Sequence, residues 1–374
     1  MRELVETLTA WRAEGQQVGR AVVIRTFGSA PRPEGAVLLG AADGRLAGSV
    51  SGGCVEGAAY EEIDRARRDG HVRVIRYGIS DEQAWDVGLA CGGTIDVLVE
   101  PGVPVAVATA ATDLEHGSAV LTPLPADAPP AAFGPHEPGP GAPPEALLVV
   151  RDDGRLTDAA GASGTTGDPA TDAELIRGSL EALGRGTSRT IAAGDRQYFV
   201  EVFPVRPRLV IVGAVQVAIA LVRLARELGF ETVVVDGRQA FATRERFPDV
   251  DRLVVGWPDE VAEEIGLGPA DSVAVLSHDV KFDEPAILEA LRRGCRYVGA
   301  VGSRKTQGDR RARLLEAGVT AAELARLHGP IGLDLGGRAP AETALAILAE
   351  IVAARHGGTG VPMVQQATLT ATLS

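Results

Sequence analysis

The sequence has few cysteines, and this scarcity excludes several classes of protein. Three occur in 374 residues, at positions 54, 91 and 295, and none belongs to a Cys-x-x-Cys pair. A disulfide framework or a structural zinc site needs more cysteines at closer spacing. We therefore expect a protein of a reducing compartment, and the cytoplasm is the expected location.

Long apolar runs and an excess of positive charge are also missing. No run approaches the roughly 18 apolar residues of a membrane-spanning helix, and the first residues lack the charged-then-apolar order of a secretion signal. The 37 basic and 50 acidic residues give a formal charge of −13, which disfavours nucleic acid and anionic membrane surfaces as partners. The length suits two domains in a soluble protein, and any bound anion must be held by local geometry.

One stretch of the sequence, residues 49–56, delivers a cysteine next to two glycines and reads SVSGGCVE. Before it, Asp43-Gly44 between two apolar segments predicts a β-hairpin, and after it apolar residues recur at helical spacing over 55–69. Cys54 is therefore expected at a strand-to-helix junction, where unpaired N–H groups and the helix dipole favour a thiolate and bind anions. The alternative is a small buried hydrophobic residue.

Two further features of the first half could serve the same site. Cys91 is followed by Gly92 and Gly93 immediately before the strand-like segment 94–100, so the backbone there can approach a ligand closely. Arg32 stands between two prolines that restrict the directions its guanidinium can take. It is a candidate to face an anion near Cys54, and the alternative is a solvated loop arginine.

Residues 1–205 mix helical and strand patterns and predict an α+β domain. Helices are expected over 3–14, 55–69 and 173–183, and strands over 20–26, 71–77, 94–100, 104–109, 118–123, 146–151, 187–193 and 197–205. Between them, the segment 124–144 is rich in Pro, Ala and Gly and is expected to be a weakly ordered excursion. Pro204 and Pro207 mark the boundary to the next domain.

Residues 206–356 alternate buried strands with amphipathic helices, which predicts a Rossmann-like, doubly wound parallel sheet. Asp236 closes the second strand about 20 residues after Gly213, where a dinucleotide-binding fold places its ribose-binding acid. The first turn, however, has Val215 where the second glycine of G-x-G-x-x-G belongs, and its branched side chain would obstruct a pyrophosphate. A glycine at 215 is therefore expected to improve NAD(P) binding, and residues 357–374 are expected to form a flexible tail.

Polar loops follow the later strands of this sheet, at the carboxyl ends where open α/β sheets bind ligands. His278 and Asp279 follow the fourth strand, and Asp334 precedes the last helix. Ser303 and Arg304 follow the fifth strand and open a helix, an arrangement that suits a phosphate. His278 is a candidate functional residue, and the alternative is a structural histidine.

Taken together, these motifs resemble the XdhC/CoxI family, the maturation factors of molybdenum hydroxylases such as xanthine dehydrogenase and carbon monoxide dehydrogenase. The resemblance covers nearly the whole chain and rests on residues 28–32, 48–56, 91–93, 277–279, 297–304, 328–334 and 349–353. The chain departs from the family at Val215 and Gln216, where glycine and histidine are usual. It also has Ser277 where threonine is common, and the serine retains the hydroxyl.

The resemblance implies an α/β protein in which an N-terminal α+β cysteine-containing domain precedes a C-terminal Rossmann-like domain. It implies a chaperone that binds the molybdenum cofactor (molybdopterin) and delivers it, in sulfurated form, to a molybdenum hydroxylase. A cysteine desulfurase would be a partner, and a homodimer is the default assembly. We expect both domains to contribute to cofactor binding.

The residues expected to act fall into three groups. Cys54 is the candidate molybdenum ligand, and Cys54 and His278 are the candidate catalytic residues. The residues expected to bind the cofactor are Arg32, Gly52, Gly53, Cys54, Glu56, Cys91, Gly92, Gly93, Gly213, Asp236, His278, Asp279, Ser303, Arg304 and Asp334.

Two other functions compete with the chaperone. The first is an NAD(P)-dependent oxidoreductase that binds the nucleotide through Gly213 and Asp236 and uses Cys54 or His278 on its substrate. The second is a scaffold that joins the desulfurase to the hydroxylase and binds no small molecule.

Overall fold

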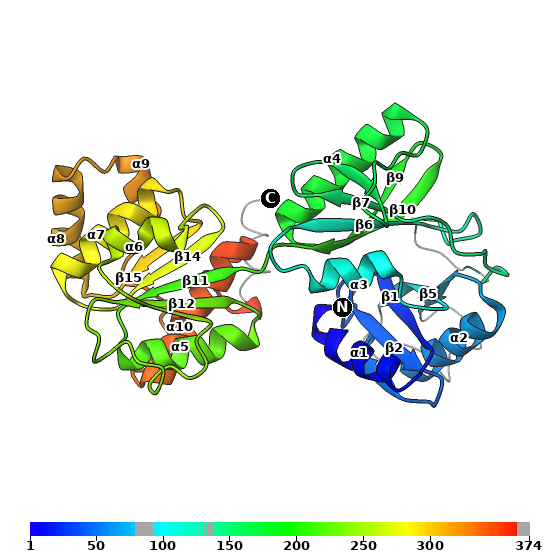
Figure 1. Cartoon of the computed structure of the whole chain (residues 1–374), viewed down its shortest axis with the longest axis horizontal. Coiled ribbons are helices and arrows are strands. Elements are labelled where there is room, and N and C mark those ends of the chain that lie inside the picture. The colour runs from blue at the N-terminus through cyan, green and yellow to red at the C-terminus, as the bar shows by residue number, and fades with distance from the viewer. Residues whose placement is uncertain (79–92, 131, 133–135, 137, 365–374) are drawn as a thin grey trace. The chain divides into compact units, whose positions relative to one another are not determined.

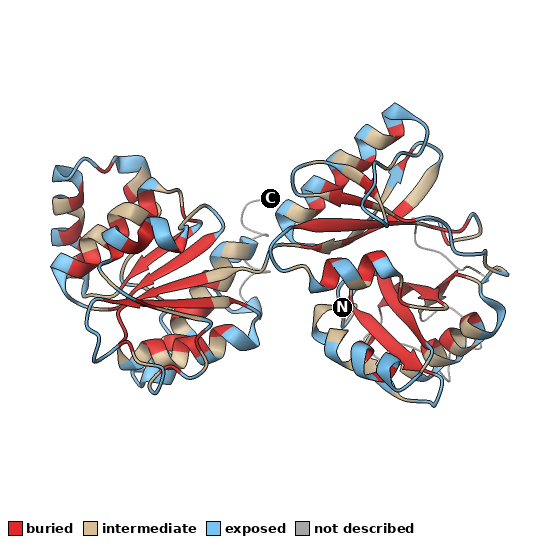
Figure 2. Ribbon diagram, viewed as in Figure 1, coloured by how far each residue is buried: buried red, intermediate tan, exposed pale blue. Residues whose placement is uncertain are grey.

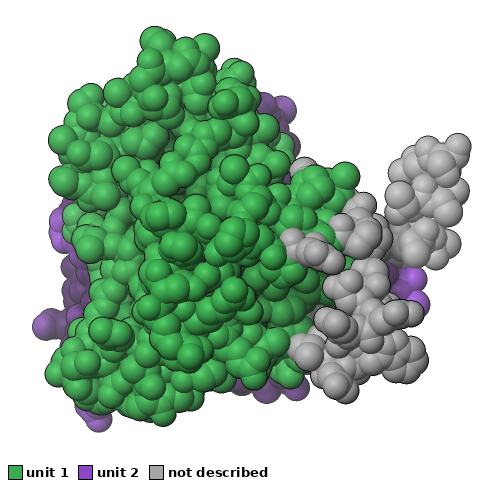
Figure 3. Space-filling view, turned by 90° about the vertical axis from the view of Figure 1, so that its right-hand side faces the viewer, with its two compact units in different colours: residues 1–205 green, residues 206–374 purple. Residues whose placement is uncertain are grey.

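The computed structural model describes residues 1–78, 93–130, 132, 136 and 138–364. The chain divides into two compact units, Met1–Val205 and Arg206–Ser374 (Figures 1 and 3). Each unit has hydrophobic cores of its own (Figure 2). Within the described ranges, no helix is long and apolar enough to cross a membrane.

The first sheet of unit 1 is antiparallel, and its described strands run in the order β3-β2-β1-β5-β4. Its elements are η1 (Arg2–Leu4), α1 (Val5–Ala13), β1 (Val18–Phe27), β2 (Val37–Ala41), β3 (Leu46–Gly48), α2 (Glu56–Asp69), β4 (Arg73–Tyr77) and β5 (Thr94–Glu100). Side chains of β1 alternate between the two faces, as the pleat requires. Ala21 and Val23 pack under α2, whereas Val22 and Ile24 enter the core on the other face.

The second sheet of unit 1 is also antiparallel, with its described strands in the order β8-β7-β6-β10-β9. The elements are α3 (Val105–Thr112), β6 (Ser118–Pro123), β7 (Leu148–Arg151), β8 (Leu156–Asp158), α4 (Pro169–Arg185), β9 (Arg189–Ala193) and β10 (Arg196–Phe203). One face packs against α4, and the other shares a core with the first sheet. Unit 1 therefore stacks two sheets between α2 and α4 (Figure 1).

Buried ion pairs join the two sheets of unit 1. The guanidinium of Arg20, on β1, donates to Glu100 of β5 and to Glu201 of β10, with 2.8 Å to the Glu201 carboxylate. All three side chains are buried, and such groups are stable in a core only when paired.

The prediction of a strand over 104–109 is wrong, because residues Val105–Thr112 form the helix α3. The run VAVATAAT is apolar over a short length, so its pattern does not distinguish a buried strand from a buried helix. Alanine, the best helix former, decides the outcome, and Pro104 suits the position before the first turn.

The excursion 124–144 carries no named helix or strand, but contacts hold its described residues. Ala142 and Val72 exchange backbone hydrogen bonds of 2.7 and 3.0 Å. The carbonyls of Pro129 and Pro130 accept from the buried arginines of β1 and β4, Arg25 and Arg76, at 2.9 Å each. A proline-rich segment offers carbonyl acceptors without competing N–H donors. That the excursion is weakly ordered stays a prediction.

Unit 2 confirms the predicted Rossmann-like sheet. Its described strands are all parallel and run in the order β13-β12-β11-β14-β15-β16. The elements are β11 (Arg208–Val212), α5 (Gln216–Glu227), β12 (Glu231–Asp236), β13 (Arg252–Val255), α6 (Pro258–Ile265), β14 (Asp271–Val275), α7 (Val280–Arg292), β15 (Tyr297–Ala300), α8 (Arg304–Glu316), α9 (Ala321–Leu324), β16 (Leu327–His328) and α10 (Pro340–His356).

Helices cover both faces of this sheet. α5 and α10 bury apolar residues on one face, and α6, α7 and α8 do so on the other (Figure 1). The order of strands reverses between β11 and β14, so the turns after these two strands meet at the topological switch point.

Candidate functional site

The turn that carries Cys54 joins β3 to α2 and is organised by Glu56. One carboxylate oxygen accepts from Ser49 Oγ at 2.6 Å and from the Ser51 amide at 2.9 Å. The other accepts from Ser51 Oγ at 2.5 Å and from the Gly53 amide at 2.9 Å. Burial alone would raise the pKa of Glu56, but these hydrogen bonds, led by those from Ser49 and Ser51, lower it to about 2.

The amides next to the thiol are also occupied within the chain. Cys54 N and Val55 N both donate to Ser51 Oγ at 2.9 Å. The sequence predicts unpaired N–H groups here that would hold a thiolate or an external anion. This prediction is wrong for the amides of residues 51, 53, 54 and 55, because they donate to the side chains of Ser51 or Glu56. Glu56 fixes the turn, and its contact with the cofactor stays a prediction.

What the turn leaves accessible is the cysteine itself. Cys54 is exposed, and so are Gly52 and Gly53. Both glycines have positive φ, +80° and +117°, where other residues are strained. Among the described residues, no atom beyond the chain neighbours lies within 4 Å of a Cβ built at Gly53. The turn therefore presents an exposed thiol on a backbone that Ser51 and Glu56 hold in place.

The loop 28–33 lies against this turn. A Cβ at Gly52 would be 3.9 Å from the Cβ of Pro31, and a Cβ at Gly93 would be 2.7 Å from the carbonyl oxygen of Ser29. Arg32 itself lies 3.9 Å from Glu3 and is part-exposed. Cys91 and Gly92 lie outside the described residues. The structure thus brings the loop, Gly52 and Gly93 together.

In unit 2, side chains of the same unit bond the backbone of the first turn, which follows β11. Asp236 accepts from the Ala214 amide at 2.7 Å, and Arg238 donates to both of its oxygens at 2.9 and 2.8 Å. Burial would raise the pKa of Asp236, but the hydrogen bonds from Arg238 and Ala214 hold it below its ordinary value. Both oxygens of Asp236 are thus engaged within the chain, and its role as a ribose-binding acid stays a prediction.

Two arginines cover the same turn. Arg238 lies over the ring of Phe241 at 4.2 Å, and Arg246 donates to the carbonyl of Ala214 at 2.9 Å. Gly213 packs on the neighbouring turn, since a Cβ there would be 2.9 Å from Ser277 N. Gly213 is thus required by the contact between the two turns at the switch point.

The later turns of the carboxyl edge are more open. His278 is exposed and has φ +63°, the one positive φ outside glycine in the described ranges. Asp279 caps α7 by accepting from the Lys281 amide at 3.0 Å, and Ser303 caps α8 by accepting from the Thr306 amide at 3.1 Å. Asp334, in the loop before α10, is exposed.

Two positively charged side chains follow the cap of α8 directly. The side chains of Arg304 and Lys305, in the first turn of α8, are exposed and have no hydrogen-bond or ion-pair partner in the part of the chain that the structure describes. A helix start with two unpaired cations favours an anion such as a phosphate.

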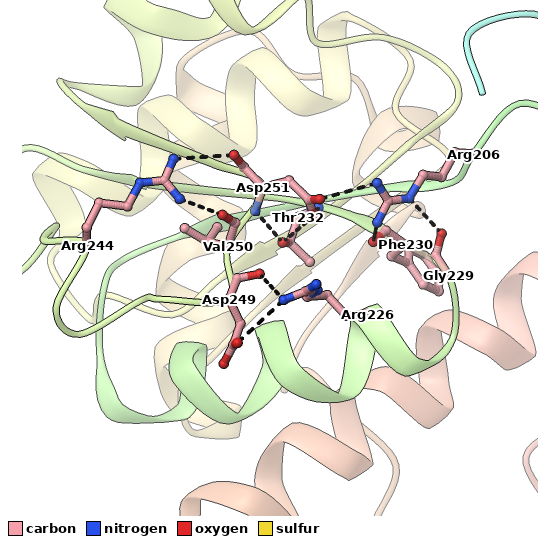
Figure 4. A network of polar contacts seen from close by, with 9 residues as sticks. All are labelled: Arg206, Arg226, Gly229, Phe230, Thr232, Arg244, Asp249, Val250 and Asp251. Atoms are coloured by element: carbon pink, nitrogen blue, oxygen red, sulfur yellow. Dashed lines mark hydrogen bonds and ion pairs between the residues drawn. The ribbon is translucent and has the colours of Figure 1, made fainter. Parts of the chain in front are cut away.

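A network of polar contacts joins loops at the opposite, amino-terminal edge of the sheet (Figure 4). In this network, Arg206, Arg226 and Arg244 donate to Asp249, Asp251 or nearby backbone carbonyls. Asp251 also accepts from the Thr232 amide at 2.8 Å. These arginines hold loops together, which distinguishes them from the unpaired cations at the start of α8.

Sequence reasoning missed Glu350 of α10. Its carboxylate accepts from Tyr297 Oη at 2.6 Å and from the Gly332 amide at 2.7 Å, and it lies 3.1 Å from His328 Nδ1. Burial would raise the pKa of Glu350, but the hydrogen bonds, that of His328 first, lower it. The available signal was its position in the motif 349–353, on which the resemblance partly rests.

Comparisons with known proteins agree with this architecture. The family model described as the XdhC Rossmann domain matches residues 209–351, and that of the XdhC and CoxI family matches residues 11–78. A solved structure from Bacillus halodurans, described as a xanthine dehydrogenase, superposes with a TM-score of 0.72 at 25% identity. It covers 95% of this chain and 96% of that one.

Two curated relatives match over most of their length. A Bacillus subtilis protein described as a probable xanthine dehydrogenase subunit is 26% identical over 93% of this chain and 96% of that protein. The molybdenum cofactor insertion chaperone PaoD of Escherichia coli is 27% identical over 93% of this chain and 88% of that protein. With both family models matched in the expected order, the chain belongs to the XdhC and CoxI family.

Proposed function

We propose that this protein is a maturation factor that binds the molybdenum cofactor as cargo and delivers it, in sulfurated form, to a molybdenum hydroxylase of the xanthine dehydrogenase type. The name of its relative PaoD, a molybdenum cofactor insertion chaperone, supports the cargo. The names of the other relatives support the class of client. A cysteine desulfurase that supplies the sulfur and a homodimeric assembly are part of the proposal.

The observation that carries the proposal is the exposed Cys54 on its immobilised turn. A soft thiol is a suitable ligand for molybdenum. Among the described residues, no three His, Cys, Asp or Glu side chains group as a metal site. A single protein ligand fits a metal that arrives with the dithiolene ligands of its own pterin, and it leaves the metal easy to hand over.

The second cysteine that the structure describes, Cys295, is unsuited to this role, because it is buried whereas Cys54 is exposed. Cys295 is buried in the core of unit 2, and burial raises the pKa of its thiol to about 12. It therefore stays a neutral thiol at physiological pH and offers a control for the loss of a sulfur atom.

The test loads the full chain anaerobically with purified molybdenum cofactor, removes the excess and measures the retained pterin by fluorescence after oxidation. Cys54→Ser is expected to retain little cofactor at an unchanged circular dichroism spectrum, because a hydroxyl is a poor ligand for the metal. Cys295→Ala is expected to retain as much as the wild type. The loaded protein should then activate a cofactor-free hydroxylase.

Equal retention by wild type and Cys54→Ser would refute the role of Cys54. If the wild-type protein retains no pterin, the cargo itself is wrong, and the scaffold function takes its place.

A further inference from the structure

A chain of buried polar contacts runs beneath the carboxyl edge of unit 2 and begins at Ser277. The Ser277 hydroxyl donates to Asp283 Oδ1 at 2.5 Å and accepts from the Asp279 amide at 3.2 Å. These two bonds bracket His278, whose φ is +63°. The backbone of Ser277 also touches the turn after β11 at Gly213.

From Asp283 the chain of contacts crosses to the neighbouring turn. Asp283, on α7, is fully buried and accepts from Arg310 Nη2 of α8 at 3.0 Å. Arg310 is 3% exposed and donates through Nη1 to the carbonyl of Val301 at 3.0 Å and to Gln307 Oε1 at 2.9 Å. The ion pair therefore ties the His278 turn to the turn that ends in Arg304.

Gln307 extends the connection to the loop after β16. Its amide donates to the carbonyls of Ala300 and Val301 at 2.9 and 3.1 Å. A Cβ built at Gly329 would lie 2.4 Å from Gln307 Oε1, so the loop packs directly on this side chain. Four turns of the carboxyl edge, those after β11, β14, β15 and β16, are thus connected by three buried side chains and one serine.

A histidine in the left-handed region is under strain, and such strain persists only where the surroundings impose it. The side chain of His278 does not explain the strain, because it is exposed and has no hydrogen-bond partner among the described residues. The imposing contacts come from its neighbours, Ser277 and Asp279, and through them from Asp283 and Arg310. These contacts leave the His278 imidazole exposed at the carboxyl edge, where open α/β sheets bind ligands.

We propose that Ser277, Asp283 and Arg310 are positioning residues that hold His278 in its left-handed conformation, so that the imidazole contacts the cargo bound at this edge. The cargo is that of the proposed function, on which this inference rests. His278 acts on the cargo, and the other three act through His278.

The experiment is a double-mutant cycle on the full chain with Ser277→Ala, His278→Gly and the two combined. Two quantities are measured: the affinity for purified molybdenum cofactor, and the unfolding midpoint of the calorimetric transition assigned to unit 2. Because glycine adopts positive φ without strain, His278→Gly should raise that midpoint by about 1–3 °C while it weakens cofactor binding several-fold.

Ser277→Ala alone should also weaken cofactor binding several-fold, since the imidazole is no longer held. In the His278→Gly background it should change the affinity by less than twofold. Ser277→Thr, which keeps the hydroxyl, should restore wild-type affinity. The midpoint gain of His278→Gly should shrink in the Ser277→Ala background, because the relaxed turn no longer strains the histidine.

The proposal would be overturned if the fold-losses of affinity in Ser277→Ala and His278→Gly multiply in the double variant, because the two residues would then act independently. A lower unfolding midpoint for His278→Gly than for the wild type would also overturn it. If the wild type binds no cofactor, the proposed function fails, and the midpoints alone decide the positioning role. Additive midpoint shifts then refute it, whereas non-additive shifts support the constraint of His278 by Ser277.

Discussion

The glycine turn of unit 1 and the first glycine turn of unit 2 have one feature in common: a carboxylate of the chain accepts from their backbone amides. Each precedes a helix and exposes backbone N–H groups that suit an anion. In unit 1, Glu56 accepts from the Ser51 and Gly53 amides, and in unit 2, Asp236 accepts from the Ala214 amide. In both turns, at least one of these amides is therefore occupied by a carboxylate of the chain itself.

The two regions differ in what remains free. The turn of unit 1 presents a thiol, Cys54, whereas the edge of unit 2 presents the cations Arg304 and Lys305 and the strained His278. The difference indicates that an amide-lined turn by itself does not locate a ligand. The groups that find no partner within the chain are better candidates.

The largest effect is expected where the internal carboxylate of unit 1 is removed. Glu56→Gln replaces an acceptor of several hydrogen bonds by a group whose NH₂ faces donors, so we expect unit 1 to lose more than the roughly 1.5–3 kcal/mol of one bond to a charged group. Denaturant unfolding measures this loss. Glu61→Gln, an exposed acid on the same helix, should cost far less.

The same variant has a pH signature. The pKa of Glu56 is about 2 in the folded chain and 4.5 ordinarily, so the folded state binds the proton less readily than the unfolded state does. The stabilisation is present above pH 4.5 and is lost as the pH falls towards 2. Wild type should lose stability more steeply than Glu56→Gln in this window, and parallel profiles would contradict the role of the carboxylate.

A smaller effect is expected from a free cation of unit 2. Arg304→Ala should weaken molybdenum cofactor binding by roughly ten- to a hundredfold, the range of one charge-assisted pair with a phosphate. Arg304→Lys should recover part of the loss, because lysine keeps the charge and lacks the fork. Titration calorimetry with purified cofactor measures both.

Arg226→Ala is the matched control, since Arg226 already pairs with Asp249 at the opposite edge (Figure 4). It should bind cofactor as the wild type does. An equal loss in the two alanine variants would mean that overall charge, and not the start of α8, governs the affinity.

Much of the fold was predictable, because its determinants are local. The buried parallel strands of unit 2 are short apolar runs separated by amphipathic helices, and this pattern has few other solutions. The exception, α3, is an apolar run too short to show a period. The positions of Cys54, His278 and Arg304 on turns were predictable for the same reason, since glycine and capping residues mark those turns.

The partners of the site residues were not predictable. From the sequence, a carboxylate beside a glycine turn can equally be a ligand contact or an internal hydrogen-bond acceptor, and only the geometry shows that Glu56 and Asp236 accept from amides of their own turns. Asp283 and Arg310 stand 27 residues apart on different helices, and no spacing rule connects them. Burial of such charges is decided by tertiary packing, which sequence patterns do not encode.

The smallest effect is expected at the turn after β11, where the sequence predicts a gain. On the sequence alone, removal of the branched side chain in Val215→Gly should admit the pyrophosphate of NAD(P). The structure supports a different expectation, because the Asp236 oxygens that would bind the ribose accept from the Ala214 amide and from Arg238. Titration of Val215→Gly with NADH should therefore show no more binding than the wild type. Micromolar affinity in that variant would mean that Arg238 yields its place to a nucleotide, and the contrast between filled turns and free groups would no longer hold for unit 2.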